Sequence, residues 1–243
     1  MTLISYLSGL LLLLSLSSCS TNHITQNNQK QSLTDGAKVD LPLSAGINNN
    51  YRDFNKIGYQ KGDKIKNVTL LSIDGETVNF AKVMANNKPL LLISGSYTCD
   101  ISRRNIPDIN ALTVRYKDRA NVYLVYTIDA HPSDVVSPYS KNNRIEIAPA
   151  NTRDQVEASQ PKTYSERKLL ARKWQQRNNL LAPVLVDNPT NDFWLAFGQA
   201  PNMAFLINPD GTVYYKQVWF KFVDLNESLK GWFSNQSKNT TSP

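Results

Sequence analysis

The stretch PLLLISGSYTC, residues 89–99, decides the fold. Pro89 to Ile93 is an almost continuous apolar run, which is typical of a strand buried on both faces. The run stops at the small and polar residues 95–98, and the segment from Cys99 onward has helical character. A thiol at a helix N-terminus lies among free backbone N–H groups, which stabilise the thiolate. The stretch therefore predicts either a redox nucleophile at Cys99 or an inert buried thiol, the common state of a single free cysteine.

The segments around this stretch predict one domain. Asp74-Gly75 is a hairpin signal, Thr163 to Glu166 reads as a capping box, and Pro107 is expected to kink its helix. The expected strands lie at residues 68–73, 77–80, 89–93, 122–128, 183–187, 203–207 and 213–219, and the expected helices at 99–116, 163–177, 192–197 and 225–233. Residues 132–162 are an irregular insertion. This order implies an α/β fold with a central mixed sheet flanked by helices.

The N-terminal residues resemble a bacterial lipoprotein signal. The apolar stretch ends in the lipobox-like segment Leu16 to Cys19, and it is shorter than the roughly 20 residues of a membrane-spanning helix. No Lys or Arg precedes it, so the signal is atypical or the true start lies upstream. We expect a signal peptide at 1–18, a lipidated Cys19 with a flexible polar tether to residue 55, a domain at 56–235 and a disordered tail at 236–243. This predicts a lipid anchor in the bacterial cell envelope, favouring the outer membrane, with the domain in the periplasm or at the surface.

Charge and composition limit the kinds of molecule that the protein is expected to bind. The chain has 243 residues, with 27 Lys and Arg against 20 Asp and Glu, which gives a net charge of +7. The basic residues are scattered and accompany no recognised nucleic-acid motif, so a nucleic-acid partner is not expected. No phosphate-binding glycine loop and no metal-ligand cluster is evident, and Cys99 with His131 would supply too few ligands for a metal. No cofactor is therefore predicted.

The order of the elements, with a cysteine at the end of the first core strand, resembles the thioredoxin fold. Residues 103–109 resemble the kinked helix that follows the redox cysteine in that superfamily. Pro201, just before the strand at 203–207, has the position of the superfamily's cis-proline. We therefore expect a cis bond at Pro201, the alternative being an ordinary trans proline.

A narrower resemblance is to the iodothyronine deiodinases. Residues 95–99, Gly-Ser-Tyr-Thr-Cys, are similar to their Gly-Ser-x-Thr-selenocysteine pattern, with Cys99 in the selenocysteine position. Residues 126–134, which contain Asp-Ala-His-Pro-Ser-Asp, resemble the family's acidic-Ala-His-Pro-Ser-Asp segment. Gln160-Pro161, followed by Tyr164, Glu166 and Arg167, looks like the cysteine-containing bacterial relatives. The likeness extends over roughly residues 60–235.

This resemblance implies roles for single residues. Cys99 would be the nucleophile or reductant, and His131 would exchange a proton or bind the substrate, unless it only caps a strand end. Thr98 would cap the helix or donate to the thiolate. Arg103, one turn beyond Cys99, would favour the thiolate or be solvated. Ser96 and Pro201 would be supporting residues.

The resemblance implies thiol redox chemistry and leaves the substrate open. Asp100-Ile101 replace the two prolines of the animal enzymes, and the only other histidine is His23. The substrate is then a halogenated aromatic, a peroxide or a disulfide. If Cys19 is lipidated, Cys99 is the one remaining thiol, so an external thiol must act as the reductant.

Two alternatives remain open at this stage. A peroxiredoxin-like peroxidase fits Ser96, three residues before the cysteine, but Leu92 stands in its proline position. A dithiol enzyme is disfavoured because Ser102 stands in the second cysteine position. The alternative that is not an enzyme is a non-catalytic envelope lipoprotein that uses the fold as a binding scaffold.

Overall fold

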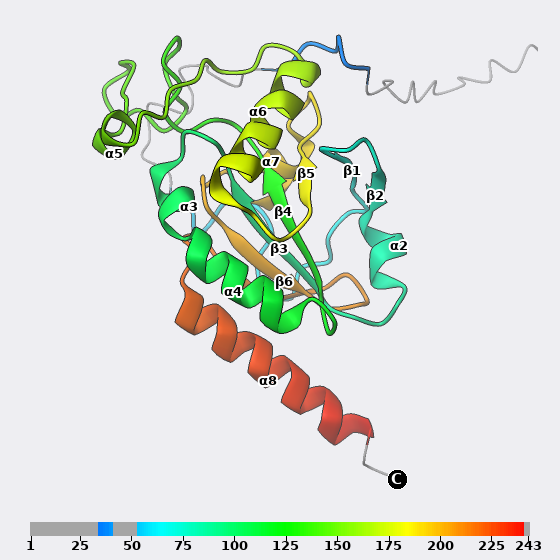
Figure 1. The fold of residues 1–243 in the computed structure, drawn as a ribbon. Coiled ribbons are helices and arrows are strands. Elements are labelled where there is room, and N and C mark those ends of the chain that lie inside the picture. The colour runs from blue at the N-terminus through cyan, green and yellow to red at the C-terminus, as the bar shows by residue number, and fades with distance from the viewer. Residues whose placement is uncertain (1–33, 41–52, 241–243) are drawn as a thin grey trace, which may run out of the picture. The chain divides into compact units, whose positions relative to one another are not determined.

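The computed structural model describes residues 34–40 and 53–240 (Figure 1). The predicted signal peptide, Cys19 and most of the predicted tether lie outside these residues. Within them, no helix combines the length and the apolar character that crossing a membrane requires.

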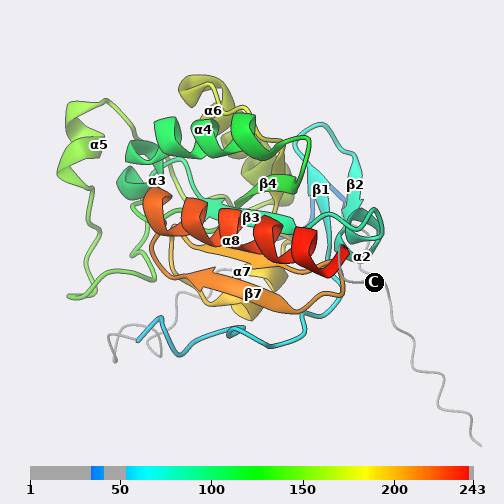
Figure 2. The ribbon, with the colours of Figure 1, turned by 90° about the horizontal axis from the view of Figure 1, so that it is seen from below.

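A mixed sheet forms the centre of the described domain (Figures 1 and 2). The order of its seven strands in the described residues is β2-β1-β5-β4-β3-β6-β7. The neighbours β3–β4 and β4–β5 are parallel, and the other pairs are antiparallel. The strands are β1 Thr69–Ser72, β2 Thr77–Asn79, β3 Leu90–Gly95, β4 Asn121–Tyr126, β5 Val184–Val186, β6 Ala204–Ile207 and β7 Val213–Gln217.

Helices cover both faces of this sheet. The helices are α2 Phe80–Met84, α3 Asp100–Arg104, α4 Ile106–Tyr116, α5 Pro149–Arg153, α6 Tyr164–Asn178, α7 Asp192–Phe197 and α8 Phe222–Thr240. One apolar cluster joins the sheet to α4, α6 and α8, and a second joins its other face to α2 and α7. Figure 2 shows α4 and α7 on opposite sides of the sheet. The central strands are therefore buried on both faces, as their apolar runs predict.

The connections define a thioredoxin-like fold. β3 leads through α3 and α4 to the parallel strand β4, and the chain later returns as the hairpin β6–β7 followed by α8. β3 lies between β4 and β6 in the sheet. The predicted α/β fold with a central mixed sheet is confirmed.

The predicted hairpin turn and capping box are both present in the structure. The β1–β2 hairpin turns at Asp74-Gly75, and Thr163 Oγ1 accepts the Glu166 N–H at 3.2 Å, which completes the capping box at the start of α6. The helix expected at 99–116 is interrupted at Asn105, and Pro107 lies in the first turn of α4. Proline suits this position because the first N–H groups of a helix have no partner within it.

Two boundaries differ from the expectation. Residues 34–40, expected in the tether, lie against the start of α6, where the Tyr164 N–H donates to the carbonyl of Ala37 at 2.9 Å and Val39 is buried. This contact gives backbone N–H groups in the first turn of α6 a partner outside the helix. Helix α8 extends to Thr240, through the part of the predicted tail that the structure describes.

The predicted cis bond at Pro201 is wrong, because all peptide bonds in the described parts of the chain are trans. The chain turns just before it, at Gly198 and Gln199, whose φ values are 134° and 69°. Asn202 then fixes the segment beside β3, since its Nδ2 donates to the carbonyl of Ser94 at 2.8 Å. The turn is thus made by left-handed residues and needs no cis peptide.

Gly95, the last residue of β3, gives a first test of the packing. A Cβ on this residue would lie 2.6 Å from Cζ2 of the buried Trp174. We expect Gly95→Ala to lower the free energy of unfolding by about 1–3 kcal/mol, the usual cost of overpacking a core. Urea denaturation checks this, with Gly36→Ala as the control, because no atom lies within 4 Å of a Cβ on Gly36. Equal effects of the two substitutions would contradict the packing described.

Candidate functional site

Cys99 lies where the sequence predicts it, between β3 and α3. It is the N-cap residue of α3, and its Sγ accepts the Ser102 N–H at 3.3 Å. Its own N–H donates to the carbonyl of Ser96 at 3.3 Å. The residue is only 1% exposed. The cysteine is thus in position for redox chemistry but closed to solvent in this structure.

The surroundings of Cys99 favour the neutral thiol over the thiolate. Burial raises the pKa of Cys99 to about 11, and the Asp100 carboxylate acts in the same direction. The N–H donation from Ser102 lowers the pKa but is outweighed. The backbone N–H groups of Ser102 and Ile101 at the helix start do lower the pKa of Cys99, the direction expected from the sequence, but loss of hydration outweighs them.

A buried carboxylate, Asp129, organises the residues before Cys99. Asp129 Oδ1 accepts the Thr98 N–H at 2.9 Å and the Thr98 hydroxyl at 2.8 Å, and its Oδ2 accepts the Tyr126 hydroxyl. Burial raises the pKa of Asp129, although these donors and the nearby Arg167 act against the rise. The network ties the end of β4 to the loop that carries the cysteine.

The remaining residues of the predicted acidic-Ala-His-Pro-Ser-Asp segment extend this network. The Asp129 N–H donates to Gln160 Oε1 at 3.1 Å, and the Gln160 N–H donates to Asp134 Oδ1 at 2.8 Å. The two acidic residues of the segment therefore fix the end of the insertion against the strand edge. The sequence contained these residues as a motif, but their positioning roles follow only from the structure.

His131 lies between the neighbours of Cys99 in the chain. Its N–H donates to Thr98 Oγ1 at 3.0 Å, and its Nε2 lies 3.7 Å from Asp100 Oδ1. Its Nδ1 lies 3.1 Å from the carbonyl of Glu146. A proton on Nδ1 satisfies this carbonyl and leaves Nε2 as the acceptor nitrogen of the ring. His131 therefore contacts the residues on either side of Cys99 in the chain, Thr98 and Asp100.

Two supporting residues differ from their predicted roles. Thr98 neither caps α3 nor reaches the sulfur, because its hydroxyl donates to Asp129 and the cap is Cys99 itself. Arg103 is not solvated and does not face the thiol, since it binds Asn151 Oδ1 at 2.6 Å and Asp154 at 3.2 Å. The short helix α5 supplies or adjoins both of these partners, and its position could not be predicted from residue spacing.

Ser96 and Pro201 are both buried. The Ser96 carbonyl accepts from Cys99 and from the Ser102 hydroxyl. The Ser96 hydroxyl is buried and has no hydrogen-bond partner within the part of the chain that the structure describes. Of the predicted supporting residues, Ser96 is thus the one that retains an uncommitted polar atom beside the site.

Tyr139, in the irregular insertion, is a site residue that the sequence did not indicate. Burial raises the pKa of the Tyr139 phenol, the hydrogen bond from Trp194 acts against this rise, and charge on Cys99 acts with it. The Tyr139 hydroxyl accepts the Trp194 Nε1–H at 2.8 Å. Phe54 lies beside the Tyr139 ring, with ring centroids 6.4 Å apart. We call the Tyr139–Trp194 contact the latch.

The buried Asp187 anchors the helix that carries Trp194. Its carboxylate accepts the N–H groups of Phe193 and Trp194, each at 2.9 Å, at the start of α7. Burial raises the pKa of Asp187 to about 6, although the nearby Arg167 acts to lower it. Strand β5 and helix α7 are thus joined by a carboxylate rather than by a conventional N-cap side chain.

Asp187 makes stability depend on pH. A carboxyl with a raised pKa in the folded state stabilises the fold below its unfolded pKa of about 4, and this stabilisation is lost as pH rises through about 6. In the parent chain, the Asp187 carboxyl should lower the free energy of unfolding by roughly 2–3 kcal/mol between pH 4 and pH 7. We expect Asp187→Asn to remove this pH-dependent change. Urea unfolding at both pH values measures it as the difference from the parent chain. A difference that does not change with pH would contradict the raised pKa.

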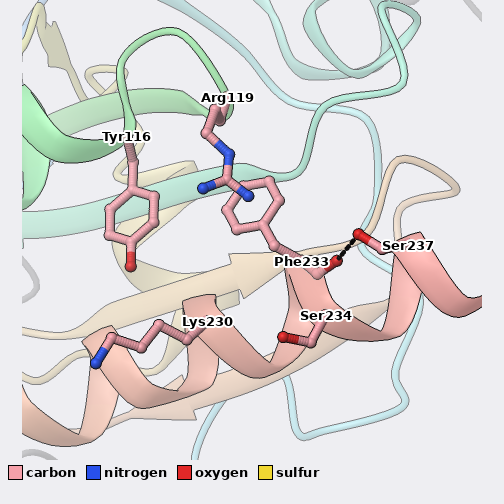
Figure 3. Close-up of a pocket in the computed structure, with 6 residues that line it drawn as sticks. All are labelled: Tyr116, Arg119, Lys230, Phe233, Ser234 and Ser237. Atoms are coloured by element: carbon pink, nitrogen blue, oxygen red, sulfur yellow. Dashed lines mark hydrogen bonds between the residues drawn. The ribbon is translucent and has the colours of Figure 1, made fainter.

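A surface pocket of about 340 Å³ lies between α4 and α8 (Figure 3). The Arg119 guanidinium lies 3.8 Å from the ring centroid of Phe233, which in turn stacks on Tyr116. The pocket contains none of the predicted site residues. No group of three or more potential metal ligands occurs among the described residues.

Comparisons with known proteins give a family and several structural likenesses. The family model described as iodothyronine deiodinase matches residues 2–227. The solved structures include a provisionally named thiol:disulfide interchange protein DsbE from Chlorobium tepidum, with 19% identity, a TM-score of 0.49, and coverage of 72% of this chain and 98% of that one. They also include an exposed lipoprotein thioredoxin from Streptococcus pneumoniae, with 16% identity, a TM-score of 0.45, and coverage of 68% and 99%.

The family match spans nearly the whole chain and includes both segments that surround the site, residues 95–99 and 126–134. The strand order and connections are independently those of a thioredoxin-like domain. The chain therefore belongs to the iodothyronine deiodinase family, with cysteine in the position of the selenocysteine.

Proposed function

We propose that the protein is a thiol-dependent oxidoreductase in which Cys99 is the reacting group and His131 exchanges the proton. The observation that carries this proposal is the position of Cys99 at the end of the central strand β3, with His131 in contact with both Thr98 and Asp100. Membership of an oxidoreductase family supports it. The substrate is a halogenated aromatic, a peroxide or a disulfide.

The first step has the same form for each substrate class. The Cys99 sulfur forms a bond to a halogen, a peroxide oxygen or a disulfide sulfur, and the bond from that atom to the rest of the substrate breaks. The thiol proton passes to the departing carbon, oxygen or sulfur, and His131 Nε2 is the nearby group that can hold it in transit. The sulfur is oxidised and the substrate is reduced by two electrons.

The second step needs an external thiol. Cys99 is the free cysteine of the described residues, and Ser102 has the position where a dithiol enzyme has its second cysteine. One thiol forms a disulfide with Cys99 and releases the bound halide, hydroxide or thiolate with its proton. A second thiol then releases Cys99 and leaves as a disulfide.

The burial of Cys99 implies that the resting site must open before Cys99 reacts. We expect Tyr139→Phe to speed alkylation of Cys99 by iodoacetamide at pH 8 by roughly two- to tenfold, since it removes one hydrogen bond of the closed state. The rate is measured in a chain with Cys19→Ala, so that one thiol reacts. Tyr123→Phe, on β4, is the matched control. A rate unchanged by Tyr139→Phe would show that the latch does not limit access.

A second candidate is a non-catalytic binding scaffold, in the class that the sequence left open. The near-complete burial of Cys99 and its pKa of about 11 favour this candidate. Consumption of an external thiol in many turnovers, with an iodinated phenol, hydrogen peroxide or a small disulfide as oxidant, decides between the two. Repeated turnover with any one of these oxidants supports the oxidoreductase. If none of the three leads to consumption of the thiol, the result supports the scaffold.

We also propose that the protein is attached to a bacterial membrane by lipid on Cys19. The lipobox-like segment before Cys19 supports this proposal. Labelling with a radioactive fatty acid tests it in cells, with Cys19→Ala as the control. Label that remains on the Cys19→Ala chain would overturn the proposal.

A further inference from the structure

A cleft of about 480 Å³ lies next to α3, among residues of α3, α5 and the end of α6. Its charged lining consists of four arginines and two acidic residues: Arg103, Arg104, Arg153, Arg177, Asp100 and Asp154. Formal charges of +4 and −2 leave an excess of two positive charges. The volume lies in the range of sites for small molecules. We call this cavity the arginine cleft.

Three of the arginines converge on one acidic residue. The carboxylate of Asp154 binds Arg103 Nη2 at 3.2 Å and Arg153 Nε at 2.8 Å, and Arg177 donates to the Asp154 carbonyl. Arg104 is exposed, and its side chain forms no hydrogen bond or ion pair with a residue that the structure describes. One carboxylate therefore balances only part of the positive charge that the fold gathers here.

Arg103 gives the cleft a fixed positive wall. Its side chain is only 8% exposed, and it is held by Asn151 Oδ1 at 2.6 Å and by the carbonyl of Tyr97 at 3.4 Å. A guanidinium held in one orientation loses little entropy when it binds a ligand. Because both Nη atoms of Arg103 already donate to protein groups, Arg103 supplies fixed positive charge, and the exposed Arg104 is the guanidinium that can meet a carboxylate in a two-point geometry.

The arginine cleft begins one residue beyond Cys99, which does not itself line it. Asp100, which lines it, follows Cys99 directly in the chain, and Arg103 and Arg104 lie about one turn further along α3. The rise of a helix places an anion at these arginines roughly 6–8 Å along the axis from Cys99. A molecule with a few bonds between its carboxylate and its reacting atom therefore spans the distance.

We propose that the arginine cleft binds the carboxylate of a small molecule that reacts at Cys99, either the reducing thiol or the substrate. The reaction at Cys99 rests on the proposed function, whereas the binding of the carboxylate does not. For a reducing thiol, the balance is that of the second step above: its sulfur bonds to Cys99, and the group that Cys99 had taken leaves with the thiol proton.

Calorimetric titration of the full chain with S-methylglutathione tests the binding, because this probe has two carboxylates and no thiol. We expect it to bind wild type, to lose about tenfold or more in affinity with the double variant Arg104→Gln and Arg177→Gln, and to bind less tightly at high salt. Its dimethyl ester should not bind. Arg119→Gln is the matched control, since Arg119 lies in the pocket of Figure 3.

The proposal would be overturned if S-methylglutathione does not bind or if its dimethyl ester binds equally well. It would also be overturned if Arg119→Gln lowers the affinity as much as the double variant does. Cys99→Ser should bind the probe as wild type does, because binding of the carboxylate does not need the thiol. If Cys99 proves unreactive, the proposed function is refuted while the carboxylate site can still be present.

The rates at which Cys99 is oxidised and reduced show whether the cleft holds the reducing thiol or the substrate. If the double variant slows reduction of oxidised Cys99 by glutathione but not by its dimethyl ester, the cleft holds the reducing thiol. If it slows only oxidation of Cys99 by carboxylate-bearing substrates, the cleft holds the substrate. If neither step changes, the link to Cys99 is wrong.

Discussion

Replacement of Cys99 by serine is expected to reduce turnover with an external thiol to the uncatalysed background for every substrate class. The sulfur is the atom that accepts the transferred group, and serine cannot form the sulfenyl or disulfide intermediate. The fold should persist, because serine is a good N-cap residue and its hydroxyl can accept the Ser102 N–H that Sγ accepts now. Thiol consumption measures turnover, and circular dichroism and urea unfolding check the fold.

Cys19→Ala is the matched control for this substitution, since it removes the other cysteine of the chain. It should leave turnover unchanged. Activity that survives Cys99→Ser, or that disappears with Cys19→Ala, would place the chemistry elsewhere than at Cys99.

The largest expected loss of stability follows Arg167→Leu. Arg167 is buried and donates to the carbonyls of Asp187 and Asn188 at 3.1 and 2.7 Å and to Asn191 Oδ1 at 2.6 Å. Its charge also acts on the buried carboxylates of Asp129 and Asp187. Leucine keeps much of the volume but leaves these groups without a cation. We expect a loss of about 3–5 kcal/mol in the free energy of unfolding, measured by urea denaturation at pH 7.

Arg172→Leu is the control for this prediction, because Arg172 is on the same helix and pairs with the exposed Asp74. Its effect should stay within about 1 kcal/mol, as is usual for surface ion pairs. If Arg167→Leu also costs less than about 1 kcal/mol, the buried network does not stabilise the site as described.

The elements that the sequence predicted are those in which neighbouring residues determine the structure. The apolar runs before Cys99 and at residues 122–128 are typical of buried strands, and they form β3 and β4. The Thr163–Glu166 capping box and the Asp74-Gly75 turn depend on contacts within a few residues. The chemistry of such contacts can be read without knowing the tertiary fold.

The parts that could not be predicted depend on residues distant in sequence. The pKa of Cys99 is set mainly by burial, and Tyr139, whose pKa responds to charge on Cys99, lies in an insertion with no apolar period. Arg103 turns away from the thiol because α5 brings Asn151 and Asp154 beside it, 48 and 51 residues later. Spacing along one helix can place Arg103 on the face of Cys99, but it contains no information about these partners.

The family resemblance supplied what local patterns could not. It pointed to His131 as the partner of Cys99, and the structure places His131 beside Thr98 and Asp100. The same segment contains Asp129, whose carboxylate holds the Thr98 backbone and hydroxyl. The motif therefore includes residues that position the cysteine loop as well as the predicted proton carrier.

Intact-mass measurement on the folded Cys19→Ala chain tests the central claim most directly. The chain is treated separately with one equivalent of hydrogen peroxide, a small disulfide and an iodinated phenol at neutral pH. The account predicts that at least one oxidant changes the mass at Cys99 alone, that an excess of thiol reverses the change, and that Cys99→Ser abolishes it. A Cys99 that all three leave unmodified until the protein is unfolded would contradict the account.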